Sequence, residues 1–125
     1  MTQASLKKLL VVDDQADIRK LIRLTIGASY EVIEAEDGQS GLQKMRQHQP
    51  QVVLLDIMMP GELDGMQVLD IIRRDAALAK TSVIMLTARG QASDFQAGMA
   101  RGADGYLIKP FSPLQLLLTI KELMK

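Results

Sequence analysis

The chain has 125 residues, of which 47% are hydrophobic and 24% are charged, a composition typical of one ordinary globular domain. Fifteen basic residues balance fifteen acidic ones, so no net charge favours binding to nucleic acid or to a membrane surface. The absence of cysteine excludes a disulfide framework, a thiolate metal site and thiol catalysis, and it fits a cytoplasmic protein.

Short apolar runs alternate with amphipathic stretches along the chain. The apolar runs predict strands at residues 9–12, 31–35, 52–55, 83–86 and 106–108. Helical periodicity predicts helices that begin at Asp17, at residue 38, at Asp64, at residue 93 and, after a Ser112 cap, at Pro113. Val32 alternates with charged residues, which indicates an edge strand. The run at 9–12 is too short for a signal peptide or a membrane span.

Five strand–helix units in strict alternation predict an α/β fold, a parallel sheet with right-handed crossovers and helices on both faces. The chain contains no internal repeat, low-complexity tract or linker, so we expect residues 1–125 to form one domain, with no output domain after it. In open α/β sheets, ligands bind outside the carboxyl ends of the strands. The residues that end the strands are therefore the candidates for a functional site.

Polar residues end four of the five predicted strands: Asp13, Asp14, Asp56, Thr87 and Lys109. Two carboxylates about 4 Å apart, at an effective dielectric constant of about 20, repel each other by about 4 kcal/mol. Such a cluster needs a proton or a bound cation, and its hard oxygen atoms suit Mg²⁺, for which Mn²⁺ can substitute. A phosphoryl group bound to both the metal and the protein would also use the hydroxyl and the ammonium.

Each of these residues has an ordinary interpretation when it is taken alone. An aspartate after a strand is usually a turn former or a helix cap, and a lysine before a proline is normally a solvated surface charge. Arg19, Lys20 and Arg23 are likewise interpreted as the solvated face of the first helix. The conjunction of five such residues at one sheet edge is what favours phosphoryl chemistry.

Four short motifs make the chain resemble the response-regulator receiver domains of two-component signalling. They are Val-Val-Asp13-Asp14, Leu-Leu-Asp56-Ile-Met-Met-Pro60, Met-Leu-Thr87-Ala88 and Tyr106-Leu-Ile-Lys109-Pro110-Phe111, in the order and spacing of that family. The resemblance covers essentially all of the chain. It implies a flavodoxin-like sheet of five parallel strands in the order 2-1-3-4-5.

The resemblance also implies a role for each matching residue. Asp56 would accept a phosphoryl group from a histidine kinase or a histidine phosphotransfer protein. Asp14, Asp56 and the backbone carbonyl of Met58 would bind Mg²⁺, with Asp13 acting directly or through water. Thr87 and Lys109 would contact phosphoryl oxygens, helped by a cis peptide bond before Pro110.

Signal output is also implied by the resemblance. Thr87 and Tyr106 match the switch positions, so a surface formed by the fourth helix, the fifth strand and the fifth helix would control partner binding or dimerisation. The last helix carries Leu114, Leu117 and Leu118 on a second apolar side, which is either this partner surface or the margin of a wide core face.

Two positions tune the lifetime of the phosphorylated state in the family, and here they are Met58 and Arg89. Neither side chain can orient an attacking water as a carboxylate or an amide would, so we expect slow self-hydrolysis.

Two other functions remain to be weighed against a phosphorylation-activated signalling module that is not a turnover enzyme. One is a Mg²⁺-dependent phosphatase that uses an aspartyl-phosphate intermediate, although Met58 stands where such enzymes usually carry a second aspartate. The other is a scaffold that has kept the fold and lost the chemistry, which the intact set of five polar residues argues against.

Overall fold

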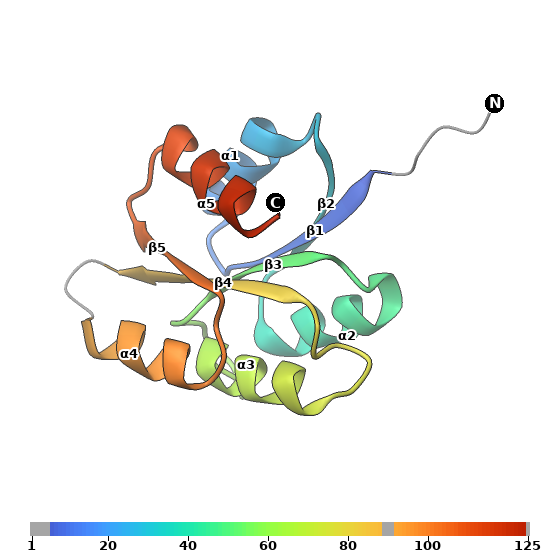
Figure 1. The fold of residues 1–125 in the computed structure, drawn as a ribbon, viewed down its shortest axis with the longest axis vertical. Helices are drawn as coiled ribbons and strands as arrows, with labels where there is room; N and C mark the ends of the chain where they lie inside the picture. The colour runs from blue at the N-terminus through green and yellow to red at the C-terminus, as the bar shows by residue number, and fades with distance from the viewer. Residues whose placement is uncertain (1–5, 89–91, 125) are drawn as a thin grey trace.

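The computed structural model describes residues 6–88 and 92–124, where strands and helices alternate along the chain (Figure 1). The strands are β1 (Lys7–Val12), β2 (Tyr30–Ala35), β3 (Val52–Asp56), β4 (Ser82–Ala88) and β5 (Gly105–Lys109). The helices are α1 (Ala16–Ile26), α2 (Gly38–His48), α3 (Gly65–Arg74), α4 (Ala92–Ala100) and α5 (Pro113–Leu123).

The strands form one parallel sheet in the order β2-β1-β3-β4-β5, which confirms the predicted fold. β2 lies at one edge, as the alternation around Val32 predicts. Figure 1 shows α1 and α5 on one face of the sheet and α2, α3 and α4 on the other. This arrangement leaves the carboxyl ends of the strands at one common edge.

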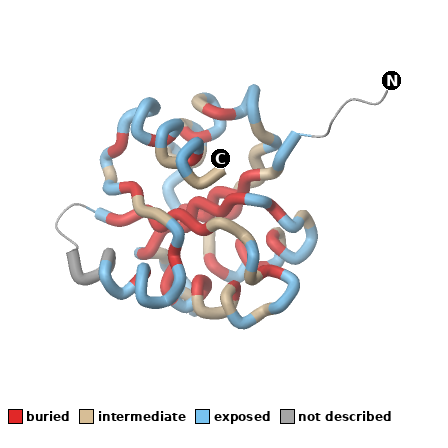
Figure 2. The backbone as a smooth tube through the Cα atoms, in the orientation of Figure 1, coloured by how far each residue is buried: buried red, intermediate tan, exposed pale blue. Residues whose placement is uncertain are grey.

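The central strands are buried on both faces because helices cover both sides (Figure 2). Alternate residues of each strand enter two separate cores. Leu10, Val53 and Val83 pack under α2 and α3, whereas Leu9, Val52 and Ile84 pack under α1 and α5. The continuous apolar runs in the sequence follow from this double burial.

Local signals in the sequence start several helices. The Asp37 carboxylate accepts a hydrogen bond from Ser40 N and caps α2. Reciprocal capping boxes start α3 at Asp64 and α5 at Ser112, with Pro113 at the first helical position. These caps set where each helix begins relative to the strand before it.

A glycine brings α3 close to the end of β3. A Cβ atom at Gly65 would lie 2.2 Å from the backbone oxygen of Asp56, so any other residue would push the helix away. The Gly65 N–H donates to the Ile57 carbonyl at 2.9 Å. The loop that follows Asp56 is therefore held against the first turn of α3.

All five strands are longer than predicted, and three of them extend further at their carboxyl ends, with β3 reaching Asp56. β4 continues to Ala88 and β5 continues to Lys109, so Thr87 and Lys109 lie within the strands and do not follow them. The reason is that backbone pairing persists to the last register pair, Ala88 with Lys109, beyond the point where the apolar pattern ends. Among the described residues, no helix is both long and apolar enough to cross a membrane.

Candidate functional site

The register of the sheet brings the predicted polar residues to one edge. Val12 pairs with Leu55, which places Asp13 beside Asp56. Asp56 pairs with Leu86, which places Thr87 at the same edge. Ala88 pairs with Lys109 on the next strand. Parallel strands in register thus collect side chains that lie far apart in the sequence.

Three carboxylates form a compact group at this edge. One oxygen from each of Asp13, Asp14 and Asp56 lies within 4.8 Å of the others. Asp13 and Asp56 are buried, with exposed fractions of 0% and 5%, while Asp14 is exposed. A set of hard oxygen donors, two buried and one open to solvent, fits a divalent ion such as Mg²⁺ that keeps part of its water shell.

Lys109 supplies the positive charge next to these carboxylates. Its Nζ lies 2.7 Å from Asp13 Oδ2, 3.4 Å from Asp56 Oδ2 and 3.1 Å from Gln15 Oε1. One ammonium does not neutralise the group, because the group contains three carboxylates and Lys109 pairs with two of them. A further cation or proton is therefore favoured at this edge.

The protonation of Asp56 reflects its surroundings. Burial, and after it the negative charge of Asp13, raise the pKa of Asp56 to about 7, although Lys109 and the Met58 N–H act in the opposite direction. The Met58 N–H donates to Asp56 Oδ1 at 3.3 Å. Asp56 is thus a carboxylate for which a proton and a bound cation compete near neutral pH.

The other predicted site residues have the following places. Thr87 is 4% exposed, and its hydroxyl makes a long contact of 3.5 Å with the Ala88 carbonyl. The peptide bond between Lys109 and Pro110 is cis. Met58, two residues after Asp56, is 66% exposed. Arg89, the second lifetime position, lies outside the described residues.

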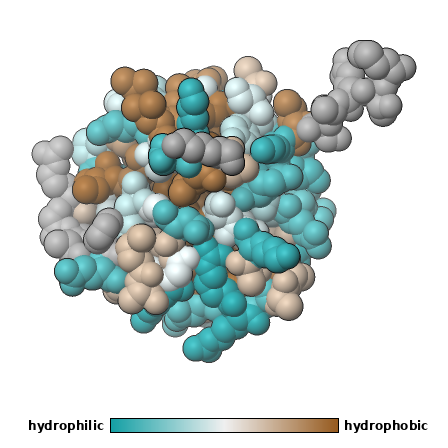
Figure 3. Space-filling view, viewed as in Figure 1, coloured by the Kyte–Doolittle hydropathy of each residue, from teal (hydrophilic) through white to brown (hydrophobic). Residues whose placement is uncertain are grey.

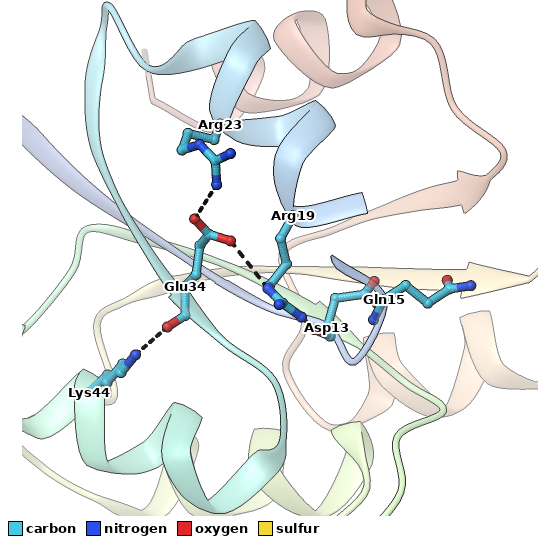
Figure 4. A network of polar contacts seen from close by, with 6 residues as sticks. All are labelled: Asp13, Gln15, Arg19, Arg23, Glu34 and Lys44. Carbon is cyan, nitrogen blue, oxygen red and sulfur yellow. Dashed lines mark hydrogen bonds and ion pairs between the residues drawn. The ribbon is translucent and has the colours of Figure 1, made fainter. Parts of the chain in front are cut away.

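A polar network behind the acidic loop was not predicted (Figure 4). Arg19 donates from Nη1 to the Asp13 carbonyl at 2.7 Å and from Nε to Glu34 at 3.2 Å, and Arg23 donates to the other Glu34 oxygen at 2.6 Å. The interpretation of Arg19 as a solvated residue is wrong, because its side chain is only 17% exposed. Arg19 instead ties the loop that carries Asp13 to β2.

The packing of Tyr106 depends on a glycine of α4. Tyr106 is half-buried and packs against the core beneath α2 and α3. A Cβ atom at Gly98 would lie 2.3 Å from the Tyr106 hydroxyl oxygen, so the glycine lets the helix approach the ring. Tyr106, the residue predicted as a switch, therefore lies directly against α4.

Apolar side chains are exposed on α4, β5 and α5. They are Met99, Ile108, Leu114, Leu117 and Leu118, with exposed fractions between 43% and 64%. In Figure 3, hydrophobic residues gather over the part of the face that α5 occupies. Because Leu116 and Ile120 alone are fully packed into the core on the inner side, the alternative of a wide core face for α5 is wrong.

Comparison with known proteins adds an independent finding. A family model described as the response regulator receiver domain matches residues 9–121. The transcriptional regulatory protein ResD of Bacillus subtilis (strain 168) is 40% identical over 126 residues, which cover 100% of this chain and 51% of that protein. The phosphate regulon transcriptional regulatory protein PhoB of Klebsiella pneumoniae is 38% identical over 120 residues, covering 95% and 52%.

A solved structure agrees with these relatives. The chemotaxis response regulator CheY4 of Vibrio cholerae superimposes with a TM-score of 0.87 at 34% identity, covering 94% of this chain and 98% of that one. By contrast, the chain spans about half the length of the curated relatives ResD and PhoB. The similarity to those two proteins is therefore confined to one part of each.

Proposed function

The chain belongs to the response regulator receiver domain family, and we propose that Asp56 is the residue on which it accepts a phosphoryl group. Receiver domains of this family are phosphorylation-activated signalling modules. The observation that supports Asp56 as the acceptor is its position. The residue is buried at the carboxyl end of β3, in a group with two other carboxylates, and its Oδ2 lies 3.4 Å from the Lys109 ammonium. We propose that residues 1–125 form one such domain.

The proposed reaction needs a nucleophile and a partner for the transferred charge. An Asp56 oxygen would attack phosphorus while the phosphohistidine nitrogen, or the acyl oxygen of a small donor, leaves with its electron pair. Lys109 and the Thr87 hydroxyl would then contact phosphoryl oxygens. Mg²⁺ held by Asp13, Asp14, Asp56 and the Met58 carbonyl would neutralise charge on the phosphoryl group.

Removal of the metal provides a direct test. We expect acetyl phosphate to add one phosphoryl group to the chain in the presence of Mg²⁺, as measured by intact-protein mass spectrometry. Chelation of Mg²⁺ should slow labelling by about a hundredfold or more, because the transferred charge then lacks its main partner. Mn²⁺ should restore the rate. Labelling at the same rate with and without the metal would contradict the proposed site.

The proposed output is a change in the surface of α4, β5 and α5. The nearly buried Thr87 and the half-buried Tyr106 are the proposed switch residues, since added charge at Asp56 would draw the hydroxyl and free space for the ring. The exposed apolar side chains of this surface would bind a downstream partner or a second copy of the chain.

Sedimentation tests the dimer version of this output. With Mg²⁺ and beryllofluoride, a phosphoryl mimic, we expect the chain to shift from monomer to dimer. Leu118→Ser should weaken the dimer about tenfold, because it removes one apolar side chain from the contact. Leu24→Ser is the control, since Leu24 is 72% exposed and belongs to α1, which is not one of the three elements of this surface. A monomer in both states, or equal weakening by both variants, would count against the dimer.

The remaining predictions follow from the same assignment. The exposed Met58 cannot orient an attacking water, so we propose slow self-hydrolysis and a module that is not a turnover enzyme. The comparisons give no support to the phosphatase alternative. ResD and PhoB are named as transcriptional regulators, so the predicted lack of direct nucleic-acid contact is proposed for residues 1–125 alone. The cytoplasmic location stays a prediction.

A further inference from the structure

The side chain of Gln15 makes a contact that its position in α1 does not explain. Gln15 is the N-cap residue of α1, where a side chain commonly accepts a hydrogen bond from the first turn. Gln15 makes no such bond, and Lys109 Nζ instead donates to Gln15 Oε1 at 3.1 Å across 94 positions of sequence. In Figure 4 the Gln15 side chain extends away from Arg19, Arg23 and Glu34.

The backbone of Gln15 is also held in place next to the acidic group. Its backbone N–H donates to Asp13 Oδ1 at 2.8 Å, and its carbonyl accepts from Arg19 N at 3.2 Å, which anchors the residue at the start of the helix. Both the backbone N–H and the backbone carbonyl of Gln15 are therefore hydrogen-bonded, which fixes the backbone from which the side chain extends. A side chain on a fixed backbone loses less conformational freedom when it binds a partner.

Gln15 differs from the other acceptors around Lys109 because it is neutral. Asp13 and Asp56 belong to the group of carboxylates that would hold a divalent ion, so a metal and the ammonium would compete for their oxygens. The Gln15 carboxamide carries no charge, and its oxygen accepts from Lys109 at 3.1 Å. Because hard divalent ions prefer carboxylate oxygens, we expect the amide oxygen to keep its contact with Lys109 when the carboxylates bind a metal.

We propose that Gln15 is a positioning residue for phosphoryl transfer, which holds the Lys109 ammonium beside Asp56 while the carboxylate attacks. This inference rests on the proposed function of Asp56. In the step, an Asp56 oxygen forms a bond to phosphorus, the bond from phosphorus to the acetyl oxygen breaks, and acetate leaves with the electron pair. Lys109 keeps its proton and faces a phosphoryl oxygen. An ammonium that is already in position lowers the entropic cost of reaching the transition state.

Two substitutions test the contact itself. Gln15→Met keeps a side chain of similar length that accepts hydrogen bonds only weakly, and Gln15→Ala removes the side chain. With acetyl phosphate and saturating Mg²⁺, both variants should label about tenfold more slowly than the wild type, the factor expected for a hydrogen bond to a charged group. Gln47→Ala, at an exposed position of α2, is the control and should label at the wild-type rate.

A double-variant cycle separates positioning from a general loss of structure. If Gln15 acts through Lys109, adding Gln15→Met to Lys109→Met should slow labelling no further. Wild-type labelling by Gln15→Met, or equal slowing in both backgrounds, would overturn the inference. In that case the proposed function still stands if the wild type is labelled and Asp56→Asn is not. Labelling of Asp56→Asn would overturn the proposed function instead.

Discussion

Asp56→Asn should abolish phosphoryl labelling by acetyl phosphate and Mg²⁺, a loss of about a thousandfold or more in rate. The variant keeps the size and shape of the side chain, so the fold and the contact with the Met58 N–H at 3.3 Å can persist. What it removes is the anionic oxygen that attacks phosphorus, and an amide is a far weaker nucleophile. Intact-protein mass spectrometry measures the result directly.

The surrounding carboxylates make this a demanding test. Carboxylate oxygens of Asp13 and Asp14 lie within 4.8 Å of one of Asp56. If the position of Asp56 did not make it the nucleophile, one of these neighbours could take the label instead. Asp17→Asn, at an exposed carboxylate in the first turn of α1, serves as the control and should label normally. A one-phosphoryl mass gain in Asp56→Asn at the wild-type rate would assign the phosphoacceptor elsewhere.

Much of this site could be predicted because it depends on short-range pattern and on topology. Apolar runs set the strands, and parallel strands meet at their carboxyl ends, so Asp13, Asp56 and Thr87 had to share one edge. The order of the strands came from the family resemblance and was confirmed. Pattern alone does not specify which strands are neighbours.

The contacts that the sequence could not predict depend on tertiary distances. Helical spacing correctly separates the apolar and charged faces of α1, but it does not reveal that the Arg19 guanidinium reaches the Asp13 carbonyl at 2.7 Å. The same holds for Gln15 and Lys109, which meet only after β1 and β5 take their places. Long polar side chains have several partners within reach, and only the folded structure selects one.

The exposure of α5 shows an intermediate case. Its sequence has two apolar sides, and periodicity left open which would be buried. The structure places Leu116 and Ile120 in the core and leaves Leu114 and Leu118 more than half exposed. The difference arises from how α5 lies against the sheet, since a helix of this width can pack only one stripe of side chains.

Folding stability should fall as pH rises from about 4 to 7, in a way that depends on Asp56. Burial and Asp13 raise the pKa of Asp56 from 3.8 to about 7, so the folded chain keeps this proton over a range in which the unfolded chain has lost it. The unfolded state binds fewer protons there, and the free energy of unfolding therefore decreases with pH. Above about pH 7 both states are ionised, and the decrease is complete.

Asp56→Asn isolates this contribution because it removes the titrating group and leaves every other one. Each tenfold change in proton affinity corresponds to about 1.4 kcal/mol, so we expect the variant to be more stable than the wild type by on the order of 2 to 4 kcal/mol at about pH 8. The difference should shrink steadily as the pH is lowered toward 4. Urea unfolding followed by circular dichroism measures both values, since the chain has no tryptophan.

Magnesium should offset the loss of folding stability that accompanies the ionisation of Asp56. A cation bound among Asp13, Asp14 and Asp56 stabilises the folded state only, so saturating Mg²⁺ at about pH 8 should raise the stability of the wild type. Asp56→Asn lacks one ligand and much of the repulsion, and it should gain far less. If wild type and variant differ by the same free energy at both pH values, and respond equally to Mg²⁺, then Asp56 neither carries the raised pKa nor faces the metal. The electrostatic basis of the site would then have to lie with Asp13 and Lys109 instead, whose ion pair spans 2.7 Å without Asp56.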